Sequence, residues 1–249
     1  MLKCLRFLKV HTPREWLQNM MKTVAVIPAA GSGIRMGGER SKQFLDLNGR
    51  PVLAVTLSHF QKCAGIDAII LVVPSKDIDY CRIEIIERYT FNKVKKIVPG
   101  GKMRQDSVRL GIEGIDEDYG LVLIHDGVRP LIDARFLQRV IDTAKIHQAV
   151  ITGLSARETV KEVNNDFEVV KTCDRDRIWM IQTPQVFRYK DILKAHQKAY
   201  KEGWDKATDD SFLIERLGIP VKVVEGSETN IKITTPYDLK LAGFILDQT

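Results

Sequence analysis

Short apolar runs alternate with segments of helical spacing along most of the chain. The apolar runs are rich in β-branched residues and occupy 23–30, 67–74, 93–100, 120–127 and 149–154. Apolar residues recur at helical spacing in 51–63, 77–90, 104–115 and 133–148. Strands that alternate with helices of this length are typical of βαβ units. The pattern predicts an α/β, Rossmann-like fold, a mostly parallel twisted sheet with helices on both faces.

The last third of the chain continues the pattern with less regular spacing. We expect helices at 189–202, from Asp210 and from Pro236, and strands at 221–226 and 230–235. In parallel sheets, ligands bind where strands end at their carboxyl edge. The loops after residues 30, 98 and 125 are therefore the first places to look for a functional site.

Residues 155–178 interrupt the alternation. Two β-rich stretches flank Asn164-Asn165-Asp166, a turn signal, so the segment reads as a protruding β-hairpin arm. A lone hairpin is marginally stable in water, and its apolar residues need a partner surface. These residues are Val160, Val163, Phe167, Val169 and Val170. Packing on a second subunit is one solution, and folding back onto the same domain is the other.

Residues 1–21 form a separate basic segment with a net charge of +3. Lys9, His11 and Pro13 interrupt the apolar stretch that a signal peptide needs, and Pro13 would break a surface membrane helix. We expect a disordered N-terminal extension followed by one domain at 22–249, with 155–178 as a dimerisation arm.

Composition narrows the class of protein. The 249 residues are 44% hydrophobic and 28% charged, ordinary globular values, and no run of 18 apolar residues could span a membrane. Outside 1–21 the net charge is only +3, too weak for a nucleic-acid protein but suited to a small anionic substrate. Four cysteines without a C-x-x-C pair argue against a disulfide framework and against a zinc site. Free cysteines are typical of a reducing compartment, so we expect a cytoplasmic location.

A glycine-rich loop, A-A-G-S-G-I-R-M-G-G, follows the first predicted strand at 29–38. Glycines let the backbone approach phosphate oxygens closely. The loop matches neither the dinucleotide fingerprint nor the G-x-x-x-x-G-K-[ST] phosphate loop. Arg35 in the loop and Lys42 after it supply positive charge instead. Together they would offset the repulsion between a nucleoside triphosphate and a second phosphate.

Two more loops carry candidate chemistry. In G-G-K-M-R-Q-D-S-V (100–108), paired glycines open a helix, and Ser107 with the Gly101 amide could read a base edge; a turn with an N-cap is the ordinary structural explanation. In H-D-G-V-R-P (125–130), Asp126 ends a strand, where it could meet a metal or a hydroxyl group, or cap a turn. His125 reads as a packed histidine at the strand end.

Four residues late in the chain are unremarkable one by one: Thr159, Arg175, Thr183 and Lys232. Lys232 alternates with Ile231 and Ile233, so it should project from one face of a strand, where solvent is the ordinary destination.

Taken together, these motifs resemble the 2-C-methyl-D-erythritol 4-phosphate cytidylyltransferase family. The resemblance rests on P-A-A-G-S-G-x-R-M with S-K-Q-F, G-G-x-x-R-x-D-S-V, H-D-G-V-R-P, R-E-T-V-K, D-R-x-x-I-W-x-x-Q-T-P-Q and N-I-K-I-T, and spans residues 23–246. It implies that CTP and methylerythritol phosphate give the CDP-alcohol and pyrophosphate with Mg²⁺, a step of non-mevalonate isoprenoid synthesis. It also implies a homodimer in which the arm reaches over the neighbouring subunit.

The resemblance implies a role for each motif residue. Those along the nucleotide are Ala29, Ala30, Gly31, Gly33, Gly101, Arg104, Ser107, Asp126 and Gly127. Those that bind the alcohol phosphate are Asp126, Arg129, Thr159, Arg175, Thr183 and Lys232. The implied catalytic residues are Arg35, Lys42, Arg175 and Lys232. Mg²⁺ would be bound mainly through the CTP phosphates, with Asp126 as a candidate ligand. Lys102 stands where some relatives carry Asp, so we expect backbone groups to read the base there.

Other functions remain open at this point. A ribitol 5-phosphate, or other polyol phosphate, cytidylyltransferase fits T-T-P-Y-D-L-K near the C-terminus equally well, while P-A-A-G and D-R-x-x-I-W favour methylerythritol phosphate. A catalytically silent nucleotide-binding regulator is a second alternative, against which the retention of Arg35 and Lys42 argues. A dehydrogenase is a distant third.

Overall fold

The structure, a computed structural model, describes residues 21–31, 41–116, 119–204 and 207–248. The expectations for the N-terminal extension at 1–20 and for Gly33 and Arg35 lie outside these residues. Among the helices described, none is both long and apolar enough to cross a membrane.

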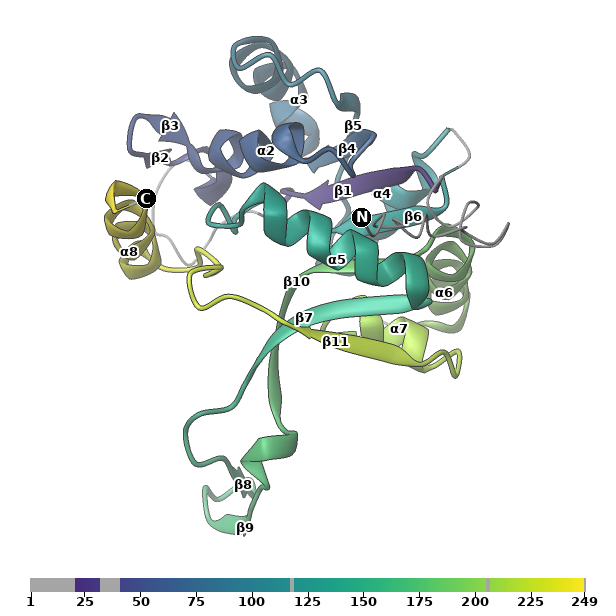
Figure 1. The fold of residues 1–249 in the computed structure, drawn as a ribbon, viewed down its shortest axis with the longest axis vertical. Coiled ribbons are helices and arrows are strands. Elements are labelled where there is room, and N and C mark those ends of the chain that lie inside the picture. The colour runs from purple at the N-terminus through teal and green to yellow at the C-terminus, as the bar shows by residue number, and fades with distance from the viewer. Residues whose placement is uncertain (1–20, 32–40, 117–118, 205–206, 249) are drawn as a thin grey trace, which may run out of the picture.

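A seven-stranded sheet forms the centre of the described chain (Figure 1). Its order is β11 (Val221–Glu225), β7 (Ala149–Ser155), β10 (Trp179–Arg188), β6 (Leu121–Ile124), β1 (Thr23–Pro28), β4 (Ala68–Val73) and β5 (Val94–Pro99). β10 runs antiparallel to both neighbours, and the other pairs are parallel. The predicted mostly parallel sheet is confirmed.

Helices cover both faces of the sheet, as predicted. α2 (Val52–Lys62) and α5 (Ala134–Ile146) pack on one face, and α4 (Arg104–Glu113), α6 (Tyr189–Glu202) and α7 (Ser211–Glu215) pack on the other. β1 shows why two faces are needed. Ala25 and Ile27 point into the first core and Val24 and Val26 into the second, so all four are buried. Full burial of each Val or Ile side chain stabilises the fold by roughly 1.5–3 kcal/mol.

The helix predicted at 77–90 forms, but it is not a regular α-helix. It comprises η3 (Ser75–Asp77), a short α3 (Ile78–Tyr80) and a π-helical stretch, η4 (Cys81–Glu87). Cys81 and Ile85 on this stretch are buried in the same core as α2. The helical periodicity of the sequence therefore located the buried face but not the winding.

The final helix, α8 (Pro236–Asp247), begins where the sequence predicts. The Thr235 hydroxyl accepts the Asp238 N–H, and the Asp238 carboxylate accepts the Thr235 N–H in return. Pro236 takes the first helical position, where its missing N–H costs nothing. α8 lies beside a small hairpin of β2 (Asp46–Leu47) and β3 (Arg50–Pro51), which follows the short η2 (Lys42–Phe44) (Figure 1).

The strand predicted at 230–235 is wrong. No strand is assigned there, and the Ile233 N–H donates to the Val128 carbonyl at 2.9 Å as an isolated backbone bond. Ile233 is buried in a small core with Val128 and Val52, below the cleft described next. The alternation of apolar and polar residues therefore reflects packing of an extended segment, not a ladder between strands.

The arm forms as a hairpin of β8 (Lys161–Val163) and β9 (Val169–Thr172), followed by η5 (Arg175–Arg177). It projects away from the sheet at the ends of β7 and β10 (Figure 1). Within the described chain Val160 is half-buried, but the other apolar side chains predicted for the arm lie exposed; Phe167 is 87% exposed and Val169 is 60% exposed. The arm does not fold back onto its own domain.

Candidate functional site

Two adjoining clefts open at the carboxyl ends of β1 and β6. The first has a volume of about 410 Å³ and is lined by Ala29, Ala30, Gly31, Lys42, Gly101, Lys102, Arg104, Ser107, Asp126 and Lys232, among others. The second has a volume of about 440 Å³ and is lined by Arg104, Asp126, Arg129, Gln182, Thr183, Gln185, Asp209 and Lys232, among others. Arg104, Asp126 and Lys232 line both, so they form the boundary between the clefts.

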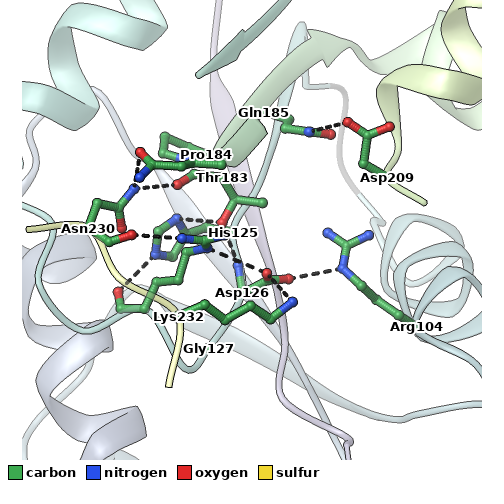
Figure 2. Close-up of polar contacts among 12 residues, drawn as sticks. Arg104, His125, Asp126, Gly127, Thr183, Pro184, Gln185, Asp209, Asn230 and Lys232 are labelled. Atoms are coloured by element: carbon green, nitrogen blue, oxygen red, sulfur yellow. Dashed lines mark hydrogen bonds and ion pairs between the residues drawn. The ribbon is translucent and has the colours of Figure 1, made fainter. Parts of the chain in front are cut away.

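Asp126 is the centre of this boundary (Figure 2). It lies two residues after the end of β6, at the middle of the sheet. Its Oδ1 lies 2.9 Å from Arg104 Nε, and its Oδ2 lies 2.8 Å from Lys232 Nζ and 3.6 Å from Arg129 Nε. The carboxylate is 7% exposed. The Lys232 side chain therefore points into the site, whereas the sequence pattern left solvent as its ordinary destination.

The three cations keep the buried Asp126 carboxylate charged. Burial alone would raise its pKa, but Arg104, Lys232 and Arg129 outweigh burial and hold the pKa of Asp126 well below its usual range. Burial lowers the pKa of Arg129, and Asp126 opposes that shift. Even when Asp210, which also pairs with Arg104, is counted with Asp126, the three cations exceed the two anions, and this excess of positive charge suits phosphate groups on either side.

Arg104 is held from its other side by a second carboxylate. Its Nη1 lies 2.8 Å from Asp210 Oδ2, and Asp210 Oδ1 lies 3.2 Å from His196 Nε2 on α6. Asp210 and His196 are both 1% exposed. Burial opposes the charge of Arg104, but Asp210 and Asp126 outweigh it and raise the pKa of Arg104. The guanidinium is therefore fixed between two anions at the wall shared by the clefts.

The turn before α4 packs tightly on the β1 loop. A Cβ at Gly100 would lie 2.1 Å from the Ala30 Cβ, so only glycine permits this approach. The Gly101 N–H donates to Ser107 Oγ at 3.2 Å, and the Ser107 hydroxyl donates to the Met103 carbonyl at 3.1 Å. Both groups predicted to read a base are thus at the cleft but bonded within the turn in this structure.

Gly127 lies behind the first cleft. Its N–H donates to the Pro28 carbonyl at 3.0 Å and its carbonyl accepts the Thr56 hydroxyl at 3.0 Å. A Cβ there would lie 2.9 Å from the Ala29 Cβ. This packing accounts for the glycine in H-D-G-V-R-P, and it holds the loop of β6 against the loop of β1.

Thr159 and Arg175 lie elsewhere. Both are exposed residues of the arm segment, and Arg175 Nη1 donates to the Arg157 carbonyl at 3.0 Å. Neither lines the clefts of its own chain. Among the described residues, the fold therefore assembles the other predicted site residues and leaves these two apart.

Sequence reasoning missed several polar residues of the site. Asp210 holds Arg104, and its neighbour Asp209 accepts from Gln185 Nε2 at 2.7 Å. Asn230 is fully buried and donates through Nδ2 to the Thr183 carbonyl at 2.8 Å. The adjacent carboxylates of T-D-D-S at 208–211 were the available signal, since two acidic residues beside a short helix seldom both serve as caps.

A divalent cation has few protein ligands here. Within the described residues no group of three or more His, Cys, Asp or Glu side chains could hold a metal ion. Asp126 is the one acidic side chain among the described residues that line the first cleft. This donor set fits Mg²⁺, which commonly binds through one or two carboxylates plus substrate phosphates.

Comparison with known proteins identifies what the chain is similar to. Residues 23–248 match the family described as IspD, 2-C-methyl-D-erythritol 4-phosphate cytidylyltransferase. The Syntrophus aciditrophicus protein of that name is 49% identical over 221 residues, 89% of this chain and 94% of its own. The Geotalea uraniireducens protein of that name is 45% identical over 224 residues, 89% of this chain and 95% of its own. The crystal structure of the Anaerococcus prevotii 4-diphosphocytidyl-2C-methyl-D-erythritol synthase aligns with a TM-score of 0.82 and 36% identity, covering 93% of this chain and 99% of that one.

Proposed function

Because this chain belongs to the 2-C-methyl-D-erythritol 4-phosphate cytidylyltransferase family, we propose that it joins CTP to 2-C-methyl-D-erythritol 4-phosphate and releases pyrophosphate. The product is 4-diphosphocytidyl-2-C-methyl-D-erythritol, and the reaction is a step in non-mevalonate isoprenoid precursor synthesis. The observation that supports this most directly is the Asp126 cluster, which stands between two clefts and carries three cations.

The reaction needs no nucleophilic side chain. An oxygen of the substrate's phosphate attacks the α-phosphorus of CTP, the new P–O bond forms, and the bond to the β-phosphate oxygen breaks as pyrophosphate leaves. The main barrier is repulsion between anions, on the order of 4 kcal/mol per unit-charge pair at 4 Å in a partly shielded site. Catalysis is then positioning plus charge stabilisation.

Each cleft receives one substrate in this proposal. The nucleotide binds in the first cleft, with its phosphates along Ala29, Ala30 and Gly31 and with Lys42 above the α-phosphate. The alcohol phosphate binds in the second cleft, where Arg129, Thr183 and Lys232 aim its phosphate. Asp126 and Arg104 line both clefts, so they lie between the two substrates, whose phosphates meet at this boundary.

We further propose that Mg²⁺ is carried by the CTP phosphates and that Asp126 is the side chain placed to contact it. Bound there, the ion would neutralise charge on the triphosphate. The enzyme is proposed to work in the cytoplasm; Cys63, Cys81 and Cys173, the cysteines among the described residues, are free thiols.

The test is pyrophosphate release from CTP with methylerythritol phosphate, ribitol 5-phosphate and other polyol phosphates, each at matched concentrations. The proposal expects the highest kcat/KM with methylerythritol phosphate. A higher value with ribitol 5-phosphate would identify the sister activity. Tight CTP binding without turnover on any alcohol phosphate would indicate a silent nucleotide-binding regulator.

A homodimer is part of the proposal, because the arm needs a partner. Its side chains Phe167, Val169 and Val170 are all more than half exposed, and such a hairpin has little stability alone. If the arm covers a second copy, Thr159 and Arg175 can reach that copy's second cleft. This assigns a role to two residues that their own chain leaves apart from the site.

Replacing Arg175 with alanine is expected to raise the KM for the alcohol phosphate about 10-fold or more and to leave the KM for CTP unchanged. A hydrogen bond to a charged group contributes roughly 1.5–3 kcal/mol, which corresponds to that change. Arg177 lies on the same 3₁₀ turn and is also exposed, so Arg177→Ala is the matched control. An effect confined to the KM for CTP would place Arg175 at the other substrate.

Mixed dimers test the sharing of sites. A Lys42→Ala chain paired with an Arg175→Glu chain forms one site with both defects and one intact site if the arm serves the neighbouring subunit. Tandem-tagged heterodimers should therefore recover activity that neither homodimer shows. Verified heterodimers as inactive as their parents would contradict the swapped arm.

A further inference from the structure

Three chain segments meet at Asp126 and are joined by a closed set of hydrogen bonds (Figure 2). The Asp126 N–H donates to Thr183 Oγ1 at 3.1 Å, and Thr183 Oγ1 lies 3.2 Å from His125 Nδ1. His125 Nε2 lies 3.1 Å from the Arg129 carbonyl oxygen. Arg129 Nη1 donates to the Asn230 carbonyl at 2.7 Å, and Asn230 Nδ2 returns to the Thr183 carbonyl at 2.8 Å.

The partners of the His125 ring determine where its proton lies. The Arg129 carbonyl can only accept, so Nε2 carries the hydrogen. The other ring nitrogen, Nδ1, lies 3.2 Å from Thr183 Oγ1 and is the acceptor of the ring in this tautomer. The Thr183 hydroxyl must then donate to Nδ1 while its oxygen accepts the Asp126 N–H. Every bond in the set has a defined direction.

Packing alone does not explain this histidine. Its ring lies 5.1 Å from the Phe60 ring, centroid to centroid, and it is fully buried, as a packed aromatic residue would be. Both nitrogens, however, are bonded to groups of the site: one to Thr183, which holds the backbone of Asp126, and one to the backbone of Arg129. An apolar ring of the same shape would leave these groups unpaired in the interior.

We propose that His125 is a positioning residue, whose Nε2-protonated ring fixes Asp126 and Arg129 at the boundary between the two clefts. The inference rests on the proposed function, in which that boundary separates the two substrates. His125 acts through Thr183 on the N–H of Asp126, and directly on the carbonyl of Arg129. The Asn230 carbonyl completes the set by accepting a hydrogen bond from the Arg129 guanidinium. Asn230 also lies two residues before Lys232, whose amine pairs with Asp126.

Substitutions separate positioning from packing. His125→Phe keeps the aromatic ring against Phe60 and removes both bonds, so kcat should fall about 10-fold or more while the KM for CTP changes less than about 3-fold. His125→Asn keeps an acceptor at the Nδ1 position, and His125→Gln keeps a donor at the Nε2 position. Each should recover part of the lost kcat. The exposed His147, replaced by Phe, is the control.

The result that overturns the proposal is a His125→Phe enzyme that is folded and has the kcat of the wild type. If that variant does not fold, the Asn and Gln variants carry the test: equal kcat for both and for the wild type would leave no positioning role. Inactivity of the wild-type protein toward every alcohol phosphate would instead count against the proposed function, and it would leave the second measurement below unaffected.

Nitrogen NMR of ¹⁵N-histidine-labelled wild type tests the proton assignment directly. Of the five histidine signals, the one that is absent from His125→Gln belongs to His125, and it should show a protonated Nε2 and an unprotonated Nδ1. An Nδ1–H form for that signal would contradict the arrangement.

Discussion

Replacing Lys42 with alanine is expected to lower kcat about 10²-fold or more, with much smaller effects on both KM values. Lys42 begins the short η2 and lines the first cleft opposite the glycine turn before α4. Negative charge on the α-phosphate peaks in the transition state, so a cation placed there stabilises that state more than the bound substrates. Arg35→Ala is expected to behave in the same way.

Steady-state kinetics with both substrates varied will measure this effect. Lys76 is an exposed lysine on η3, so Lys76→Ala controls for the loss of one positive charge. A kcat near the wild-type value for Lys42→Ala would refute its role in the transition state. A rise in KM with kcat unchanged would assign Lys42 to ground-state binding alone.

Replacing Asp126 with asparagine is expected to lower kcat/KM about 10²-fold or more and the free energy of unfolding by about 3 kcal/mol or more. The carboxylate is the shared counter-charge of Arg104, Lys232 and Arg129. Removing it leaves Lys232 and Arg129 without this carboxylate and Arg104 with Asp210 alone, and breaking a buried ion pair typically costs about 3–5 kcal/mol. The cations would also lose the geometry that aims them at the two substrates.

The lowered pKa of Asp126 also determines how the free energy of unfolding depends on pH. The folded state lowers the pKa of Asp126 below its usual value, so the ion pairs stabilise the protein fully above about pH 4. As the pH falls through the folded-state pKa, the wild type loses that stability. Urea unfolding should therefore show the largest gap between wild type and Asp126→Asn near neutral pH and a shrinking gap in acid.

A matched carboxylate controls for the loss of a surface charge. Asp116 pairs with Lys96 at 2.9 Å, but its side chain is 74% exposed. Asp116→Asn should change the free energy of unfolding by less than about 1 kcal/mol, because solvent screens such a pair. An Asp126→Asn protein with the stability of Asp116→Asn would show that the cluster contributes little to folding.

The sequence located the loops of the site because parallel strands leave few choices. Ala29, Arg104 and Asp126 each follow a β-rich run, and the carboxyl ends of such strands meet at one edge of a sheet. The glycine turn before α4 could be predicted for a related reason. Two glycines between a strand and a helix predict a close backbone approach, and Gly100 makes one against Ala30.

Lys232 and Asp210 show where local reasoning fails. Lys232 was assigned to a strand with solvent as its ordinary destination, and it lies in an extended segment with its amine 2.8 Å from Asp126. Asp210 was seen as the start of a short helix, and its carboxylate holds Arg104, a residue 106 positions away. In both cases the partner is remote in sequence, so no periodicity or spacing encodes the contact.

By itself, the sequence determined the α/β class, the two-faced burial of the strands, the arm as a hairpin, and the loops that carry the clefts. These features follow from local spacing and from the chemistry of single residues. The tertiary structure alone decided which polar atoms satisfy one another: Arg104 between two carboxylates, and His125 between Thr183 and the Arg129 carbonyl. The physical reason is that a buried polar group must find a partner wherever the packed chain supplies one, and that partner is set by three-dimensional packing.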